Sequence, residues 1–189
     1  MLDDQALMRA LNSTPVVDGR PHDLWRDDHE LERWALEHGG IGGDEERRWL
    51  RTARDALQAV ETGASAESGP HRLRQVLAGV RRVPEPGPAG VAWRLEVPPE
   101  RRLAVELVLA WADVKERMPG RLRPCGNPEC RLFLLDRSRA NAARWCSMKT
   151  CGNRLKARRH QARTRENQRP EQGRRPDHDE HPEQDEQDE

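Results

Sequence analysis

The sequence lacks the long apolar segment that a transmembrane helix requires. Only 34% of its 189 residues are hydrophobic and 35% are charged, which is polar for a globular protein. Its first residues, Met1–Gln5, have neither the basic start nor the apolar run of a secretory signal peptide. These absences predict a cytoplasmic protein in a reducing compartment, with no membrane partner.

Catalytic motifs are missing as well. None of the seven histidines belongs to a metalloprotease helix motif, and the chain has no nucleophile elbow and no phosphate-binding loop. The pair His29-Glu30 lacks the second histidine that a zinc-binding helix places one turn later. We therefore expect ordinary polar histidines, no catalytic residues and a protein that is not an enzyme.

Cysteine is scarce, and its placement is the most specific feature of the chain. All four cysteines lie within 27 residues, as two pairs of identical C-x4-C spacing: Cys125 with Cys130, and Cys146 with Cys151. Four thiolates in two close pairs can complete a tetrahedral shell around Zn²⁺, and a shell without an open position is structural. Two disulfides are the alternative, but they require an oxidising compartment. The spacing predicts one structural zinc ion held by these four residues.

The segment that contains these cysteines resembles a known family. Arg-Trp-Cys146-Ser-Met-Lys-Thr-Cys151-Gly-Asn-Arg is similar to the signature of the CGNR zinc-finger family. The similarity is strong over Leu122–Arg159 and loose over residues 1–120. In that family the finger follows a domain called ABATE, and the whole protein is regarded as a stress-induced transcription regulator. The resemblance implies an ABATE-like domain at 1–120 and a bacterial regulator.

The start of the chain departs from the family pattern. Members usually open with an apolar residue followed by Asp-Phe-Val-Asn-Thr, and here Met8–Thr14 takes that place. Arg9 and Ala10 stand where the aspartate and the aromatic residue are usual, so we assign that position no role. The triplet from Asn12 to Thr14 is expected to form a turn and nothing more.

Hydrophobic periodicity predicts a mainly helical domain over residues 1–120. A short helix opens the chain, and others are expected to begin near Asp27 or Asp28, at a capping Asp44 and near Ser68. Arg and Glu on their outer faces are expected to be solvated, and the six tryptophans to pack in cores. The pattern after Pro99 is apolar on nearly all sides, which is typical of a core helix.

Residues 81–97 interrupt the helical pattern. Val83–Gly90 is rich in proline and glycine, which predicts a loop. Val91–Val97 alternates apolar with polar residues, which is typical of a half-buried strand. We expect a β-hairpin near 81–97, in keeping with the ABATE resemblance.

Residues 121–165 are expected to form a finger that resembles a treble clef. Arg131–Leu135 is predicted to be a strand, Ala143–Trp145 the returning strand, and the residues after Cys146 a helix that carries the last ligand. Phe133 and Trp145 are expected to supply a small separate core. The fold class is therefore mainly α with small β-hairpins: a helical N-terminal domain, a C-terminal zinc finger and a disordered acidic tail at 166–189.

Four residues of the finger are assigned to its turns and four to its charge. Gly126 and Gly152 are expected to make tight turns with their N–H groups toward sulfur, and Asn127 and Asn153 to bond their own backbone. The charge of a four-thiolate zinc site is expected to be offset by basic residues near the sulfurs, namely Arg131, Arg144, Lys149 and Arg154.

A net charge of zero conceals strong segregation. Residues 1–120 carry 17 Lys and Arg against 21 Asp and Glu, residues 121–165 carry 13 against 2, and residues 166–189 carry 3 against 10. Such asymmetry concerns partners and not the fold. The basic finger predicts contact with nucleic-acid phosphates. The residues expected to make it are Arg137, Arg139, Arg154, Lys156, Arg158, Arg159, Arg163 and Arg165.

These features predict a zinc-dependent DNA-binding protein that regulates transcription. Duplex DNA is preferred to RNA because the finger lacks the exposed aromatic residues on which single-stranded bases stack. A solvated helix that merely ends the domain is the alternative for the basic segment. An RNA-binding module, or a protein–protein interaction module with a purely structural finger, is the alternative for the chain.

Overall fold

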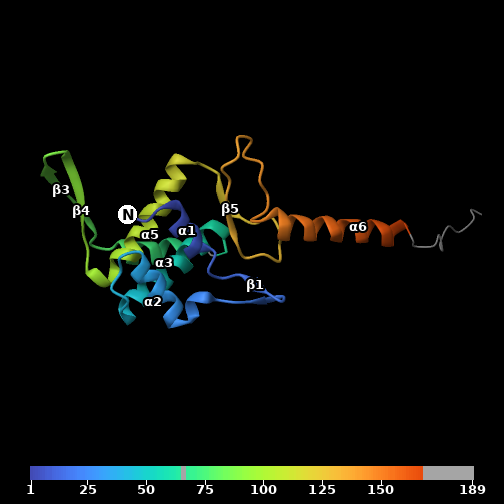
Figure 1. The fold of residues 1–189 in the computed structure, drawn as a ribbon, viewed down its shortest axis with the longest axis horizontal. Coiled ribbons are helices and arrows are strands. Elements are labelled where there is room, and N and C mark those ends of the chain that lie inside the picture. Colours follow the sequence, from blue (N-terminus) through green and yellow to red (C-terminus); the bar gives the residue numbers. More distant parts are fainter. Residues whose placement is uncertain (65–66, 168–189) are drawn as a thin grey trace, which may run out of the picture. The chain divides into compact units, whose positions relative to one another are not determined.

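The computed structural model describes residues 1–64 and 67–167 (Figure 1). Met1–Asn153 form one compact unit, and a second unit begins at Arg154. The acidic tail predicted for 166–189 lies outside the described residues from 168 onward. In chain order the elements are α1 (Asp4–Leu11), β1 (Val16–Val17), β2 (Arg20–Pro21), the 3₁₀ helix η1 (Leu24–Arg26), α2 (Asp28–Glu37), α3 (Asp44–Thr62), α4 (Ser68–Leu77), β3 (Arg81–Gly87), β4 (Gly90–Glu96), α5 (Pro99–Arg117), β5 (Leu122–Pro124), β6 (Phe133–Leu135), the π-helical turn η2 (Met148–Gly152) and α6 (Asn153–Asn167).

Helices α3 and α5 form the centre of the first unit, and α1 and α4 pack against them (Figure 1). Leu50 and Leu57 of α3 and Leu103 and Leu107 of α5 are fully buried. Burial of one such side chain stabilises the fold by about 1.5–3 kcal/mol. The mainly helical fold with small antiparallel hairpins is confirmed, as is the core helix after Pro99. None of the described helices combines the length and apolarity needed to cross a membrane.

The starts of α2 and α4 follow the predicted signals, but the start of α3 does not. The side chain of Asp27 accepts a hydrogen bond from the His29 N–H at the start of α2. Gly63 ends α3 with a positive φ of 66°. The prediction that Asp44 caps α3 is wrong, because Gly43 is the capping residue and Asp44 is already helical. Its carboxylate instead forms an ion pair with Arg47 one turn later.

Two charged residues of α3 are buried, which corrects the prediction of solvated outer faces. Glu46 has no exposed surface, and its carboxylate accepts hydrogen bonds from the N–H groups of Ile41 at 2.9 Å and Gly42 at 2.7 Å. Arg54 is 2% exposed and is bonded to Asp23. Two backbone N–H groups replace water at Oε2 of Glu46, and Asp23 pairs with the Arg54 guanidinium.

The hairpin predicted near 81–97 is present, but its two halves differ from expectation. The prediction of a loop at Val83–Gly90 is wrong, since β3 runs to Gly87 and pairs antiparallel with β4. Pro84 and Pro86 are two residues apart, so both face the outer edge of the strand, where no N–H is needed. The prediction of a half-buried strand is also wrong, because Trp93 is 58% exposed. The hairpin extends away from the helices (Figure 1).

The β5–β6 hairpin joins the finger to the helical core. β6 pairs with β5, with Leu122 opposite Leu135 and Pro124 opposite Phe133. The predicted returning strand at Ala143–Trp145 is therefore wrong, because that segment is irregular. Leu122 and Phe133 are each 2% exposed and belong to the same hydrophobic cluster as the helices. Phe133 thus contributes to the main core and not to a separate core with Trp145.

Asn12 connects the end of α1 to this hairpin. The Cys125 N–H donates to the Leu132 carbonyl at 2.8 Å, so the neighbouring Phe133 directs its own N–H and C=O away from β5. The Asn12 side chain satisfies both groups, since Oδ1 accepts from the Phe133 N–H at 2.7 Å and Nδ2 donates to its carbonyl at 3.2 Å. The prediction that this triplet is only a turn was wrong for this reason.

Replacement of Asn12 by alanine tests this connection. We expect Asn12→Ala to lower the free energy of unfolding by about 2 kcal/mol or more, because a backbone N–H and C=O lose their partners. Asn12→Asp keeps the acceptor but places a carboxylate oxygen against the Phe133 carbonyl oxygen, so it should also destabilise the protein. Chemical denaturation followed by far-ultraviolet circular dichroism measures both. Equal stability of Asn12→Ala and the unaltered protein would show that the contact is dispensable.

Candidate metal centre

The four cysteines come from two segments of the chain, the β5–β6 connection and the residues around η2, and meet at one point. Cys125 directly follows β5, Cys130 lies in the connection to β6, Cys146 precedes η2 and Cys151 lies within η2. Their sulfur atoms all lie within 4.8 Å of one another. The Cys146 sulfur is 3.7 Å from that of Cys130 and 3.6 Å from that of Cys151. Cys125 and Cys151 are buried and the other two are half-buried.

These separations fit a tetrahedral zinc site. Zn–S bonds of about 2.3 Å place the corners of a tetrahedron about 3.8 Å apart. A disulfide requires sulfur atoms about 2.05 Å apart, so the predicted alternative of two disulfides does not fit. With four thiols and no further ligand needed, the shell is closed and its role is structural. The predicted set of Cys125, Cys130, Cys146 and Cys151 is therefore brought together in positions suited to one zinc ion.

Residues 121–164 match the family model of the CGNR zinc finger. The match covers the hairpin, all four cysteines and most of α6. No curated protein matches the chain. The resemblance found in the sequence thus holds for the CGNR finger, and an ABATE-like domain at 1–120 remains a prediction.

The thiol groups of the CGNR finger do not ionise equally. Burial raises the pKa of the Cys130 thiol to about 11 and also raises the pKa of Cys146. Burial opposes ionisation of Cys151 too, but hydrogen bonds from Asn127 and the neighbouring thiols lower its pKa. At neutral pH four thiolates would therefore need a cation among them. Zinc supplies that charge when it binds, and its binding releases protons.

Hydrogen bonds to sulfur come from the backbone and from one amide. The N–H of Leu132 donates to Cys130 at 3.5 Å, and the N–H of Cys146 donates to Cys125 at 3.4 Å. The Asn127 amide donates to Cys151 at 3.6 Å. Within the described contacts of Met1–Asn153, these groups and not the predicted Arg131, Arg144 or Lys149 contact the sulfurs. The Arg144 guanidinium instead lies over the Trp145 ring.

Asn127 has a more specific role than the one predicted. It is 1% exposed, and its side-chain oxygen accepts from the Glu129 N–H at 3.2 Å, which confirms the predicted local turn. The same amide reaches the Cys151 sulfur, so it joins the first ligand segment to the last. Asn153 follows Cys151 in an identical Cys-Gly-Asn triplet but is exposed.

Glycine is required at positions 126 and 152 because a side chain would collide with neighbouring atoms there. Neither Gly126 nor Gly152 has a positive φ, and their N–H groups donate to the carbonyls of Arg144 and Ser147. The prediction of N–H groups aimed at sulfur is therefore wrong, and neither glycine is required for a left-handed backbone. A Cβ on Gly126 would lie 2.9 Å from the Arg144 carbonyl oxygen, and one on Gly152 would lie 2.9 Å from the Met148 sulfur.

Asp136 fixes the irregular segment between the two cysteine pairs. It is 3% exposed and accepts hydrogen bonds from the N–H groups of Ser138 and Ala143 and from Arg123 at 2.9 Å. The hydrogen bond from the Ser138 side chain, with these others, lowers the pKa of Asp136 to about 2, although burial opposes it. Its stabilising contribution is complete above the ordinary pKa of 3.8 and is lost as the pH falls toward about 2.

The predicted nucleic-acid contacts divide between the two units. In the first, Arg137 is exposed but forms an ion pair with Asp4 at 2.9 Å, and Arg139 is exposed. In the second, α6 contains the other six residues. Arg154, Lys156, Arg158 and Arg163 are exposed on it. Arg159 and Arg165 belong to the same helix, but their side chains lie outside the described ones.

Replacement of Asn127 by alanine is expected to weaken zinc binding by about 10–100-fold, because groups that orient ligands typically contribute this much. The measurement is competition for zinc against a chromophoric chelator under reducing conditions. Asn153→Ala is the matched control from the second Cys-Gly-Asn triplet and should leave zinc affinity unchanged. Equal effects of the two changes would remove the special role of Asn127.

Gly126→Ala is expected to destabilise the zinc-loaded protein by about 1–3 kcal/mol, because the added methyl group meets a backbone oxygen that cannot move aside. Gly152→Ala should cost less, since its methyl group mainly meets the flexible Met148 side chain. Thermal unfolding of both variants gives the order. A larger loss for Gly152→Ala would contradict this explanation.

Proposed function

We propose that the chain is a zinc-dependent DNA-binding protein that regulates transcription in bacteria, with helix α6 as the element that contacts phosphates. The main observation in support of this proposal is that α6 begins at Asn153, two residues after the last cysteine of the CGNR finger. It contains six Lys and Arg residues and a single acidic residue, Glu166. Side chains at a cationic helix surface bind the phosphate backbone without regard to sequence.

The aromatic residues of the finger support duplex DNA over single-stranded nucleic acid. Phe133 is buried in the core. Trp145 is half-buried, with the Arg144 guanidinium over its ring and both glycines against its edge. Phe133 is thus not accessible to an unpaired base, and in Trp145 a guanidinium already lies over the ring. Contacts to phosphate then provide most of the affinity.

The first 120 residues and the cellular compartment complete the proposal. An ABATE-like domain there would sense a stress signal or dimerise, and the protein would act in the cytoplasm, where thiols stay reduced. It would have no catalytic activity. These statements follow from the family resemblance and from the four unpaired thiols.

Salt dependence tests the proposal. We assume that about five Lys and Arg residues neutralise phosphates. A plot of the logarithm of the association constant against the logarithm of salt concentration should then have a slope of about −4.5. Fluorescence anisotropy with a labelled duplex and the zinc-loaded protein measures this slope. A slope near zero would contradict the proposal, and preferential competition by structured RNA would favour the RNA-binding alternative.

Charge removal on α6 locates the contact. Lys156→Gln with Arg163→Gln should weaken duplex binding uniformly across sequences, reduce the slope by about 2 and leave zinc content unchanged. Arg82→Gln, an exposed arginine of β3 outside the finger, is the matched control. Unaltered DNA affinity in the double variant would mean that α6 is a solvated helix and not the contact.

A further inference from the structure

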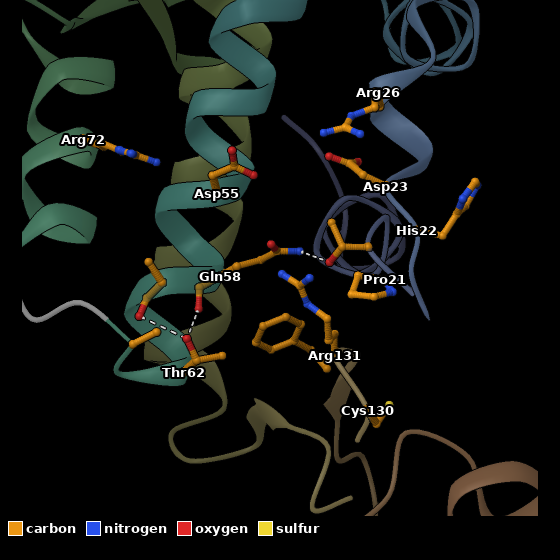
Figure 2. Close-up of a pocket in the computed structure, with 14 residues that line it drawn as sticks. Pro21, His22, Asp23, Arg26, Asp55, Gln58, Thr62, Arg72, Cys130 and Arg131 are labelled. Atoms are coloured by element: carbon orange, nitrogen blue, oxygen red, sulfur yellow. Dashed lines mark hydrogen bonds between the residues drawn. The ribbon is translucent and has the colours of Figure 1, made fainter. Parts of the chain in front are cut away.

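A cavity of about 600 Å³ lies within the first unit, where the finger meets the helical domain (Figure 2). Its wall is formed by α3, α4, the segment around β2 and η1, and the residues just before β6. Cys130, Arg131 and Phe133 come from the finger. The volume is within the range of small-molecule sites, which is about 300–1,000 Å³.

Both carboxylates on the cavity wall are already engaged. Asp23 is bonded twice to Arg54, at 2.7 and 2.9 Å, and Asp55 accepts from the Nε of the same arginine at 2.6 Å. Arg54 is 2% exposed and also donates to the Ser13 hydroxyl. Burial opposes ionisation of Asp23, but the hydrogen bond and charge of Arg54 lower its pKa. These acids therefore serve the buried arginine.

Three further arginines border the cavity. Arg26 lies at the end of η1, Arg72 on α4 and Arg131 in the finger, and all three are exposed. Among the side chains that the structure describes, none of the three forms an ion pair. Figure 2 shows their guanidinium groups directed toward the cavity from different elements. Together with Arg54 these three arginines supply four positive charges, against the two negative charges of Asp23 and Asp55. The cavity is therefore cationic.

Neutral polar groups complete the wall. The Gln58 amide donates to the Thr14 hydroxyl oxygen at 2.9 Å, and the Thr62 hydroxyl donates to the Gln58 carbonyl at 2.8 Å. Pro21, Ala59 and Phe133 contribute apolar surface to the wall.

We propose that this cavity binds a phosphate-bearing small molecule, held by Arg26, Arg72 and Arg131. Guanidinium groups pair with phosphate oxygens through two parallel hydrogen bonds. A planar carboxylate is satisfied by one such group, whereas the tetrahedral phosphate presents oxygens to groups on several sides. The site lies outside the nucleic-acid contacts proposed for α6 and does not depend on them.

Occupancy of this site would be linked to the finger. Arg131 follows the zinc ligand Cys130 directly, and Phe133 is anchored by Asn12. A ligand that contacts Arg131 together with Arg26 and Arg72 binds only when the finger and the helical domain are packed as described. Such a ligand stabilises that packed arrangement by mass action.

Titration of the full-length, zinc-loaded protein with inorganic phosphate tests the proposal. Amide resonances in an ¹H–¹⁵N spectrum are followed at constant ionic strength, with sodium chloride replaced by sodium phosphate. We expect saturable shifts with one dissociation constant at residues of the cavity wall, such as Gln58, Thr62 and Arg131. Absence of saturable shifts there would overturn the proposal.

Three variants locate the site. Arg26→Gln and Arg72→Gln should each weaken phosphate binding by about tenfold or more, since each removes charged hydrogen bonds. Arg74→Gln, on the same helix as Arg72, is the control, because Arg72 borders both this cavity and a neighbouring one whereas Arg74 borders only the neighbour. An equal loss in Arg74→Gln would assign binding to the neighbouring cavity and overturn the proposal.

A duplex-binding assay on the same variants separates this site from the proposed function. Arg26→Gln and Arg72→Gln are expected to keep the DNA affinity and salt slope of the unaltered protein. Loss of DNA affinity in step with loss of phosphate binding would make the cavity part of a nucleic-acid surface and would overturn a separate site. Phosphate binding without DNA binding would leave this inference standing and reject the function proposed for α6.

Discussion

The convergence of four sulfur atoms is the constraint on which the finger depends. The ligands are separated by irregular chain, and the only regular structure among them is the short β5–β6 hairpin and the turn η2. So little secondary structure buries too little apolar surface to be stable by itself. A bound zinc ion offsets this deficit because it binds the folded arrangement and not the separate thiols. The Asn127 amide and two backbone N–H groups then orient the sulfurs.

A second source of stability lies outside the metal site. Leu122 and Phe133 belong to the same core as α3 and α5, and Asn12 satisfies the outer edge of β6. The finger's hairpin is therefore held by sulfur at one end and by the helical domain along one face. Phe133 therefore connects the packing of the helical domain to the segment that contains the zinc ligands.

Helices and ligands were predictable because their signals are local. Apolar spacing predicted the buried faces of α3 and α5, and the two C-x4-C pairs predicted the sulfur cluster. The partner of β6 was not predictable in this way, since the pairing of Leu122 with Leu135 spans the cysteine turn and is favoured by the shared core. The segment at 143–145 resembles a strand but is fixed as a loop by Asp136.

The sequence did not predict the long-range polar contacts. Asn12 and Phe133 are 121 residues apart, and Arg54 reaches Asp23 across 31 residues, so no local pattern connects them. One signal was present, because Asn12 stands where the family that residues 1–120 loosely resemble has an asparagine. The Asp18-Gly19 pair, with both residues at positive φ, also marked the β1–β2 hairpin that was missed.

The zinc content of freshly purified protein, measured by elemental analysis alongside a count of free thiols, tests the central claim most directly. The arrangement of the four cysteines predicts one zinc ion per chain and, after chelation under reducing conditions, four reactive thiols. Protein without stoichiometric metal, whose cysteines are joined in disulfides, would contradict it.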